Sequence, residues 1–281
     1  MKKVLFIIVI VALLIIPLTA CSQEPVPGSA WASYEELLYE VTEGTTVIGS
    51  LTTTITRITE ESFEFESLER TITINDRVTR GTFIEIAYMD LSDNIFLTNQ
   101  ILMDGFNTVA SYREQVVDGA TYETKILYDD KGVDWFSLKK DGNTINSGDM
   151  RIRGSVVDSG AIYTYFRAYN IGIKDFSRTI DVPNPTTGNA ETLSFTSLGS
   201  EKVNGVPLGG EKLNDLTNID TIKARITRTS PPVGESIIVY YAQQKDEYRV
   251  IAEGSYNSFR IPVKIIENNL TYTLKEIIEV K

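Results

Sequence analysis

Apolar and polar residues alternate along most of the chain, and this period of two predicts β-strands. In residues 259–265, for example, Phe, Ile, Val and Ile alternate with Arg, Pro and Lys, so one face of the predicted strand is apolar and the other polar. Segments rich in Thr, Val, Ile, Tyr and Phe also favour strands. We therefore predict strands at 45–58, 62–75, 82–91, 122–128, 134–139, 223–229, 237–243, 248–254, 259–266 and 271–280.

Residues that favour turns separate these segments. Asp118-Gly119, Asp141-Gly142 and Asn204-Gly205 predict tight turns, because Gly and Asp adopt the backbone angles that such turns need. The proline-containing segments 183–188 and 230–232 predict loops. Residues 37–42 leave two alternatives open, a helical turn or a strand.

One segment, 158–170, has the period of a helix instead. Ile162, Tyr165, Phe166 and Tyr169 follow the i, i+3, i+4, i+7 spacing that places side chains on one helical face. Asp158 or Ser159 can cap its start, and Gly172 follows its end. A single aromatic-rich helix must bury this face. We therefore predict a mainly β fold, in which a curved antiparallel sheet wraps one helix in its concave face.

The first thirty residues differ from the rest. Met1-Lys2-Lys3 precedes thirteen consecutive apolar residues, 4–16, which suits a signal peptide and falls short of the ~20 residues of a membrane-spanning helix. The following Leu18-Thr19-Ala20-Cys21 resembles the lipobox of bacterial lipoproteins, which implies cleavage before Cys21 and attachment of lipid to it. A secretory signal with an incidental cysteine is the alternative. We predict a signal peptide at 1–20, a lipidated tether at 21–30 and one domain at 31–281.

Composition excludes several classes of function. The chain has no histidine, so Ser-His and Cys-His catalytic pairs cannot form, and its single cysteine excludes an intramolecular disulfide. A net charge of −11 argues against a nucleic-acid partner. The predicted location is the cell envelope, on the extracytoplasmic face of the plasma membrane, or of the outer membrane where one exists, with the membrane as partner through the lipid anchor.

Four segments, taken in order, resemble an uncharacterised family of bacterial envelope proteins with a domain of unknown function. They are LYEV at 38–41 with VIG at 47–49, DSGAIYTYFR at 158–167, GSEKVNGVP at 199–207 and FRIPV at 259–263. The resemblance implies a half barrel like that of the LolA/LolB lipoprotein-handling proteins, with a helix in its concavity and acyl chains as cargo. It brings no catalytic residues.

Motifs of catalysis or metal binding are incomplete. Ser137-Leu138-Lys139-Lys140 and Ser92-Asp93-Asn94 match parts of the serine β-lactamase set, but their order is reversed and the third motif is absent. Asp90, Ser92 and Asn94 have calcium-loop spacing without its glycine and final glutamate. We interpret these residues, the turn at 129–132 and the acidic stretch 60–69 as surface features. We predict no enzymatic activity, no cofactor and no metal site.

Aromatic residues are the remaining candidates for function. They fill an ordinary β core or line an apolar cavity between helix and sheet, and the pattern alone allows both. The candidate ligand-binding residues are Trp135, Phe136, Ile162, Tyr165, Phe166, Tyr169 and Tyr240. We predict binding or chaperoning of a lipid, an acyl chain or a lipoprotein segment, and accordingly expect Phe166→Ala to weaken fatty-acid binding more than stability. The alternative is a structural or interaction lipoprotein whose concavity is plugged.

Overall fold

The structure is a computed structural model that describes residues 32–76, 80–152, 156–169, 171–172, 175–204, 218–230, 232–243 and 260–280. The predicted signal peptide, the tether with Cys21, the strand at 248–254 and Gly205 of one predicted turn lie outside these residues. Within them, no helix is long and apolar enough to cross a membrane.

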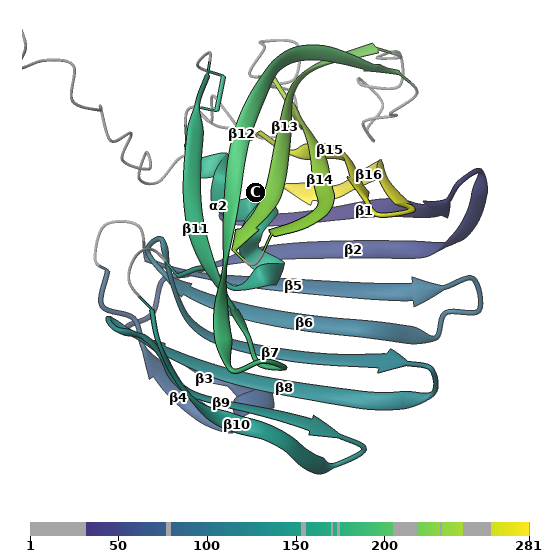
Figure 1. The fold of residues 1–281 in the computed structure, drawn as a ribbon. Coiled ribbons are helices and arrows are strands. Elements are labelled where there is room, and N and C mark those ends of the chain that lie inside the picture. The colour runs from purple at the N-terminus through teal and green to yellow at the C-terminus, as the bar shows by residue number, and fades with distance from the viewer. Residues whose placement is uncertain are drawn as a thin grey trace, which may run out of the picture.

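Fourteen of the described strands form one antiparallel sheet that curves around a short helix, α2 (Figure 1). In chain order they are β1 (Tyr34–Glu43), β2 (Thr46–Ile58), β5 (Gly81–Asp90), β6 (Ile95–Asp104), β7 (Asn107–Val117), β8 (Ala120–Asp129), β9 (Gly132–Lys140), β10 (Asn143–Arg151), β11 (Ser177–Asn184), β12 (Asn189–Asn204), β13 (Asn218–Ser230), β14 (Pro232–Ala242), β15 (Pro262–Glu267) and β16 (Leu270–Val280).

The order of strands follows the chain almost continuously. From β1 the sheet continues through β2 and β5 to β10 on one side, and through β16 to β11 on the other. The first and last strands therefore pair in the middle of the sheet, with Tyr39 opposite Leu274. Between β10 and β11 the chain leaves the sheet and forms the helical segment. Each arm of the sheet is thus a series of antiparallel neighbours, and α2 lies on the connection between the arms.

The two ends of the sheet approach each other without pairing as strands. The side-chain amide of Asn146, on β10, donates a hydrogen bond to the backbone oxygen of Pro185, in the turn between β11 and β12, at 2.6 Å. The sheet is therefore nearly closed into a barrel. The prediction of a mainly β, antiparallel fold around one helix is confirmed, whereas the half-barrel detail is not.

The outer face of the sheet carries a feature that the sequence analysis did not predict. Residues 62–75, predicted as one strand, form a separate hairpin, β3 (Ser62–Phe65) and β4 (Arg70–Thr73). Between them lies the 3₁₀ turn Glu66–Leu68, which ends at Glu69 with a positive φ of 55°. Phe65 and Leu68 pack with Leu102 of β6, so the hairpin covers one face of the sheet. The preceding residue of β6, Ile101, faces the other side and packs with the helical segment.

The helical segment is shorter and less regular than predicted. It consists of a 3₁₀ turn (Ser159–Ala161), α2 (Ile162–Tyr165) and a second 3₁₀ turn (Phe166–Ala168). Asp158 caps its start, because its carboxylate accepts a hydrogen bond from the backbone N–H of Gly160 at 2.8 Å. We call residues 159–168 the helical segment below.

The strand predictions were partly confirmed. Residues 37–42 belong to strand β1, and the turns at Asp118-Gly119 and Asp141-Gly142 have the expected positive φ angles. The loop predicted at 183–188 is shorter, because strand β11 continues through Asn184. Five strands were missed, namely β6, β7, β10, β11 and β12.

Candidate functional site

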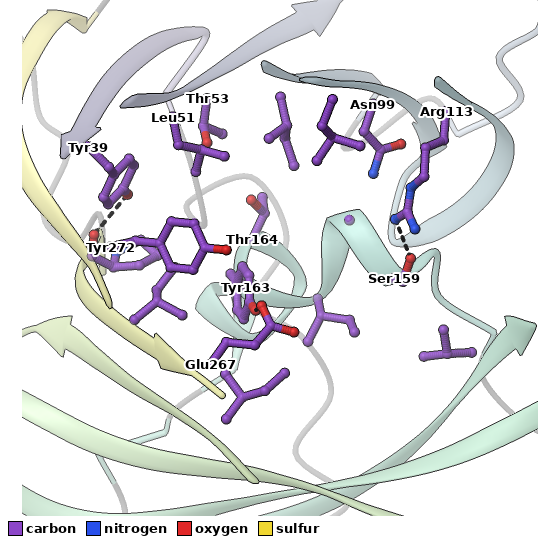
Figure 2. Close-up of a pocket in the computed structure, with 18 of the residues that line it drawn as sticks. Tyr39, Leu51, Thr53, Asn99, Arg113, Ser159, Tyr163, Thr164, Glu267 and Tyr272 are labelled. Carbon is purple, nitrogen blue, oxygen red and sulfur yellow. Dashed lines mark hydrogen bonds between the residues drawn. The ribbon is translucent and has the colours of Figure 1, made fainter. Parts of the chain in front are cut away.

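A pocket of about 350 Å³ lies between the helical segment and the inner face of the sheet (Figure 2). Both arms of the sheet contribute to it, so the barrel must be assembled for the pocket to exist. The pocket is partly open to solvent. Its aliphatic lining consists of Leu37, Leu51, Ile86, Leu97, Ile162, Val182, Leu193, Ile237, Pro262 and Ile265.

The helical segment presents its polar side to this pocket. Ser159, Tyr163 and Arg167 are spaced by four residues, which places them on one face, and Gly160 and Thr164 lie beside them. A Cβ atom on Gly160 would overlap the side chains of Asn99 and Ile101. The glycine therefore lets the start of the helical segment lie directly against β6.

A buried ion pair fixes the helical segment to the first strand. Arg167 donates two hydrogen bonds to the carboxylate of Glu35, at 2.6 and 2.7 Å, and both side chains are almost fully buried. Burial lowers the pKa of Arg167, the Glu35 carboxylate raises it, and the net direction is upward. Arg167 therefore stays charged, and the bidentate contact with the Glu35 carboxylate compensates its charge. The pair supplies polarity to the pocket wall without net charge.

One corner of the pocket combines three polar side chains, which we call the polar corner: Asn99, Arg113 and Ser159 (Figure 2). Asn99 of β6 and Arg113 of β7 are directly opposite each other in the sheet. The guanidinium of Arg113 donates to the hydroxyl of Ser159 at 2.6 Å. The side-chain oxygen of Asn99 is buried and has no hydrogen-bond partner among the described residues.

An acidic group lies on a different wall of the pocket. Glu267, on β15, accepts a hydrogen bond from the hydroxyl of Tyr163 at 3.2 Å, with Tyr272 nearby (Figure 2). Burial raises the pKa of Glu267, although Tyr163 and Arg113 oppose this shift. Burial and the charge of Glu267 raise the pKa of Tyr272 to about 12, so its phenol stays protonated. This wall therefore offers one carboxyl group and two phenols.

A second ion pair occupies the opposite arm. Arg228, on β13, lies 2.9 Å from the carboxylate of Glu191, on β12, and Asn184 donates to the same carboxylate at 2.5 Å. Arg167 and Arg228 are thus each paired with a carboxylate. Arg113 forms no ion pair with any carboxylate in the part of the chain that the structure describes.

Three of the predicted ligand-binding residues form a packed core on the other side of the helical segment. Tyr165, Phe166 and Tyr169 are buried, and the Phe166 ring stacks on Phe195 with centroids 4.1 Å apart. The hydroxyls of Tyr165 and Tyr169 are 2.6 Å apart and bond to each other. None of these three lines the pocket, whereas the predicted Ile162 does.

The other predicted residues lie farther along the sheet and also outside the pocket. Phe136 is buried with Ile126 near the β10 end, while Trp135 is 39% exposed. Tyr240 lies beneath the ammonium groups of Lys223 and Lys264, 5.4 and 6.0 Å from its ring centre. Its neighbour Tyr241 instead reaches the helical segment, since its hydroxyl donates to the backbone oxygen of Tyr163.

The fragments of catalytic and metal motifs form turns and exposed surface, except that Ser137 and Leu138 are buried on β9, so their interpretation as surface residues was wrong. Asp90 accepts hydrogen bonds from the backbone N–H groups of Ser92 and Asn94, which closes the β5–β6 turn. Asp129 closes the β8–β9 turn in the same way, through Lys131. The acidic residues of 60–69 are exposed. Among the described residues, no group of three or more acidic, cysteine or histidine side chains could hold a metal ion.

The pocket residues that the sequence analysis missed are mostly polar. Ser159, Tyr163 and Arg167 repeat every fourth residue along the segment whose apolar stripe was chosen instead. This second stripe was therefore visible in the sequence. Asn99, Arg113 and Glu267 carry no comparable signal, because their meeting depends on which strands become neighbours.

The fold and the pocket define a nearly closed antiparallel β-barrel with a partly apolar internal pocket. No protein-family model matches the chain, and no curated protein matches its sequence. A similar solved structure is a beta-barrel-like protein of the domain of unknown function DUF1849, from Brucella abortus. It is 8% identical, with a TM-score of 0.46, and the match covers 89% of this chain and 98% of that chain.

Proposed function

We propose that this protein is a lipid-anchored lipoprotein of the cell envelope that binds a hydrophobic or amphipathic ligand inside its barrel. The observation that carries this proposal is the pocket of about 350 Å³ with ten aliphatic residues in its lining. A volume in the range of ~300–1,000 Å³, apolar walls and a few polar groups are the usual features of small-molecule sites. The ligand class is a lipid, an acyl chain or a lipoprotein segment, which is the class that the resemblance to the uncharacterised envelope family implies.

The anchor and the absence of catalysis belong to the same proposal. Support for the anchor is the lipobox-like sequence that ends at Cys21. Support for a binding role is that the chain contains no histidine, while the pocket arginines and carboxylates are engaged in ion pairs or hydrogen bonds. The protein then acts as a carrier or receptor on the extracytoplasmic membrane surface.

The packing of the aromatic side chains Tyr165, Phe166 and Tyr169 favours a second function. Phe166 and Phe195 fill one side of the concavity, as expected for a structural or interaction lipoprotein with a plugged interior. In that case the pocket holds only water, and no ligand copurifies with the protein.

Blocking the pocket tests the binding function. Ile86 lines the pocket from β5, so Ile86→Trp fills part of its volume. We expect this variant to lose binding of a fluorescent fatty-acid probe by about tenfold or more, since the tail no longer fits. Ile145→Trp on β10 is the matched control, because Ile145 is 53% exposed and does not line the pocket. Native mass spectrometry of the wild type, with extraction of bound molecules, identifies the ligand.

Two results would contradict the binding function. One is wild-type protein that neither carries an extractable molecule nor binds the probe at micromolar concentration. The other is equal binding by Ile86→Trp and wild type. Localisation is tested separately with Cys21→Ser, which should release the protein from membranes and lack acyl mass. Membrane retention of this variant, together with an acyl-free wild type, would contradict the anchor.

A further inference from the structure

We propose that the pocket selects single-chain amphipathic acids, and that Arg113 binds their carboxylate. This inference rests on the proposed binding function and adds the chemical class of the ligand. It follows from the distribution of charge within the pocket and from the pocket volume.

Of the three arginines that line the pocket, Arg113 is the one that no described carboxylate pairs with, so it is available to bind a ligand. The Arg167 guanidinium is bound by Glu35, and Arg228 by Glu191. The Arg113 guanidinium contacts the neutral hydroxyl of Ser159 and no carboxylate among the described residues. A guanidinium can donate two parallel hydrogen bonds to a carboxylate, and such charge-assisted bonds are strong where water is partly excluded. Arg113 therefore fits an anionic head group.

The polar corner offers more than a charge. Asn99 is 2% exposed and lies opposite Arg113 in the sheet. Its buried amide oxygen has no described hydrogen-bond partner, a state that costs free energy. A carboxylate head cannot donate to this oxygen, but a water molecule between the two groups would satisfy it by donating one hydrogen bond to each of them. Ser159 completes the corner with a hydroxyl that can both accept and donate.

A carboxyl group on another wall of the pocket favours one orientation of the ligand. The Glu267 carboxyl, bonded to Tyr163, repels an anion when it is charged. A carboxylate head is therefore favoured at the polar corner and disfavoured beside Glu267. The tail then lies along aliphatic residues such as Leu51, Leu97 and Ile265. The volume of about 350 Å³ is near the lower end of the usual range of ~300–1,000 Å³, which favours one acyl chain over two.

Calorimetric titration of the full chain with dodecanoate, dodecanol and dodecylamine tests this inference. These probes share one tail and differ in the head. We expect wild-type protein to bind dodecanoate about tenfold or more tightly than either of the others, the effect of a hydrogen-bonded charge pair. Arg113→Gln should remove this preference and keep the weaker affinity for dodecanol, because the apolar wall is unchanged.

Two further variants separate ligand binding from a structural role of Arg113. Ser159→Ala removes one polar group of the corner and the Arg113–Ser159 hydrogen bond but keeps the cation, so it should reduce the preference for dodecanoate by less than Arg113→Gln does. Arg225→Gln makes the same change of charge at an exposed residue of β13 outside the pocket and should change nothing. Loss of the preference in Arg225→Gln, or a loss in Ser159→Ala as large as that in Arg113→Gln, would contradict direct binding by Arg113.

The outcomes distinguish the two proposals. If no probe binds to wild-type protein, the proposed function fails. If dodecanoate and dodecanol bind equally well, the pocket binds tails, but the selection of acids is wrong. Tighter binding of dodecylamine would also overturn the selection of acids and would assign the head group to Glu267.

Discussion

The surroundings of Phe166 distinguish two interpretations of its side chain: part of a packed protein core, or part of the wall of a ligand pocket. Its side chain is fully buried and stacks on Phe195, so its neighbours are protein atoms. We therefore expect Phe166→Ala to lower the free energy of unfolding by about 3–5 kcal/mol, as for other truncated core aromatics. The structure therefore predicts a larger loss of stability for this variant than the sequence analysis did. Denaturant unfolding measures the change.

Phe96→Ala is the matched control, because Phe96 is 37% exposed on β6. It should change the free energy of unfolding by about 0.5 kcal/mol or less. A stable Phe166→Ala variant that no longer binds a fatty-acid probe would contradict the packed-core interpretation. It would show instead that Phe166 contacts the ligand.

Glu267 makes the stability of the protein depend on pH. Its folded-state pKa is raised, chiefly by burial, so the folded state holds the proton more tightly than the unfolded state does. The stabilisation is complete below the ordinary glutamate pKa of ~4.3 and is lost as the pH rises through the raised value. We expect the difference in Tm between Glu267→Gln and wild type to grow in favour of the variant across this window.

Glu114→Gln is a control for this pH series, because Glu114 is exposed on β7. Its melting temperature should follow that of the wild type at every pH. A difference in Tm between Glu267→Gln and wild type that does not change with pH would contradict the role of Glu267 in the pH dependence. The effect of the variant would then come from the lost Tyr163 hydrogen bond.

Most of the aromatic residues chosen from the sequence are buried, with Trp135 as the exception, but the sequence does not show which of two adjacent aromatic residues faces the helical segment. Tyr240 and Tyr241 are adjacent in a strand, where consecutive side chains face opposite sides. Tyr241 contacts the helical segment, while Tyr240 lies under two lysines. Which of them faces inwards depends on register, and register is set by distant strands.

At the scale of elements, the helical segment depends on its cap. Asp158 accepts the Gly160 N–H at 2.8 Å, and its second oxygen accepts the hydroxyl of partly buried Tyr128 at 2.9 Å. We expect Asp158→Ala to cost about 2–3 kcal/mol, since it removes the cap and leaves the Tyr128 hydroxyl without this acceptor. Thermal unfolding measures the loss. Asp158→Asn keeps a capping oxygen and should lose less than half as much; equal losses would contradict the cap.

Two of the strands that the sequence analysis missed, β10 and β11, have compositions that local propensities assign to turns or loops. β10 consists mostly of polar residues and pairs with β9 alone, as an end strand of the sheet. β11 contains Pro183, which local rules assign to a loop, yet it pairs with β12 across its whole length. Both strands extend an existing sheet, so the neighbouring strand supplies the hydrogen bonds that stabilise them. Their own propensities contribute less.

At the scale of the whole molecule, the sheet joins the two ends of the domain. β1 and β16 pair in the middle of the strand order, and each arm continues from them. The pocket lining comes from both arms, so this central pairing also holds the two sides of the candidate site together. Sequence alone predicted a curved sheet around a helix, but it gave no means of identifying which strands form its centre.

This topology predicts that the whole sheet unfolds as one unit. Leu274 is fully buried at the β1–β16 pairing, opposite Tyr39. We expect Leu274→Ala to cost about 2–5 kcal/mol and to destabilise both arms equally, because neither arm can keep the shared inner core without the other. Hydrogen exchange followed by mass spectrometry would then report the same loss of protection in β6 and in β13. Ile145→Ala, at an exposed residue of the end strand β10, should leave both unchanged. Separate unfolding transitions for the two arms would show instead that each half of the sheet is stable by itself, and the pocket between them would then open without global unfolding.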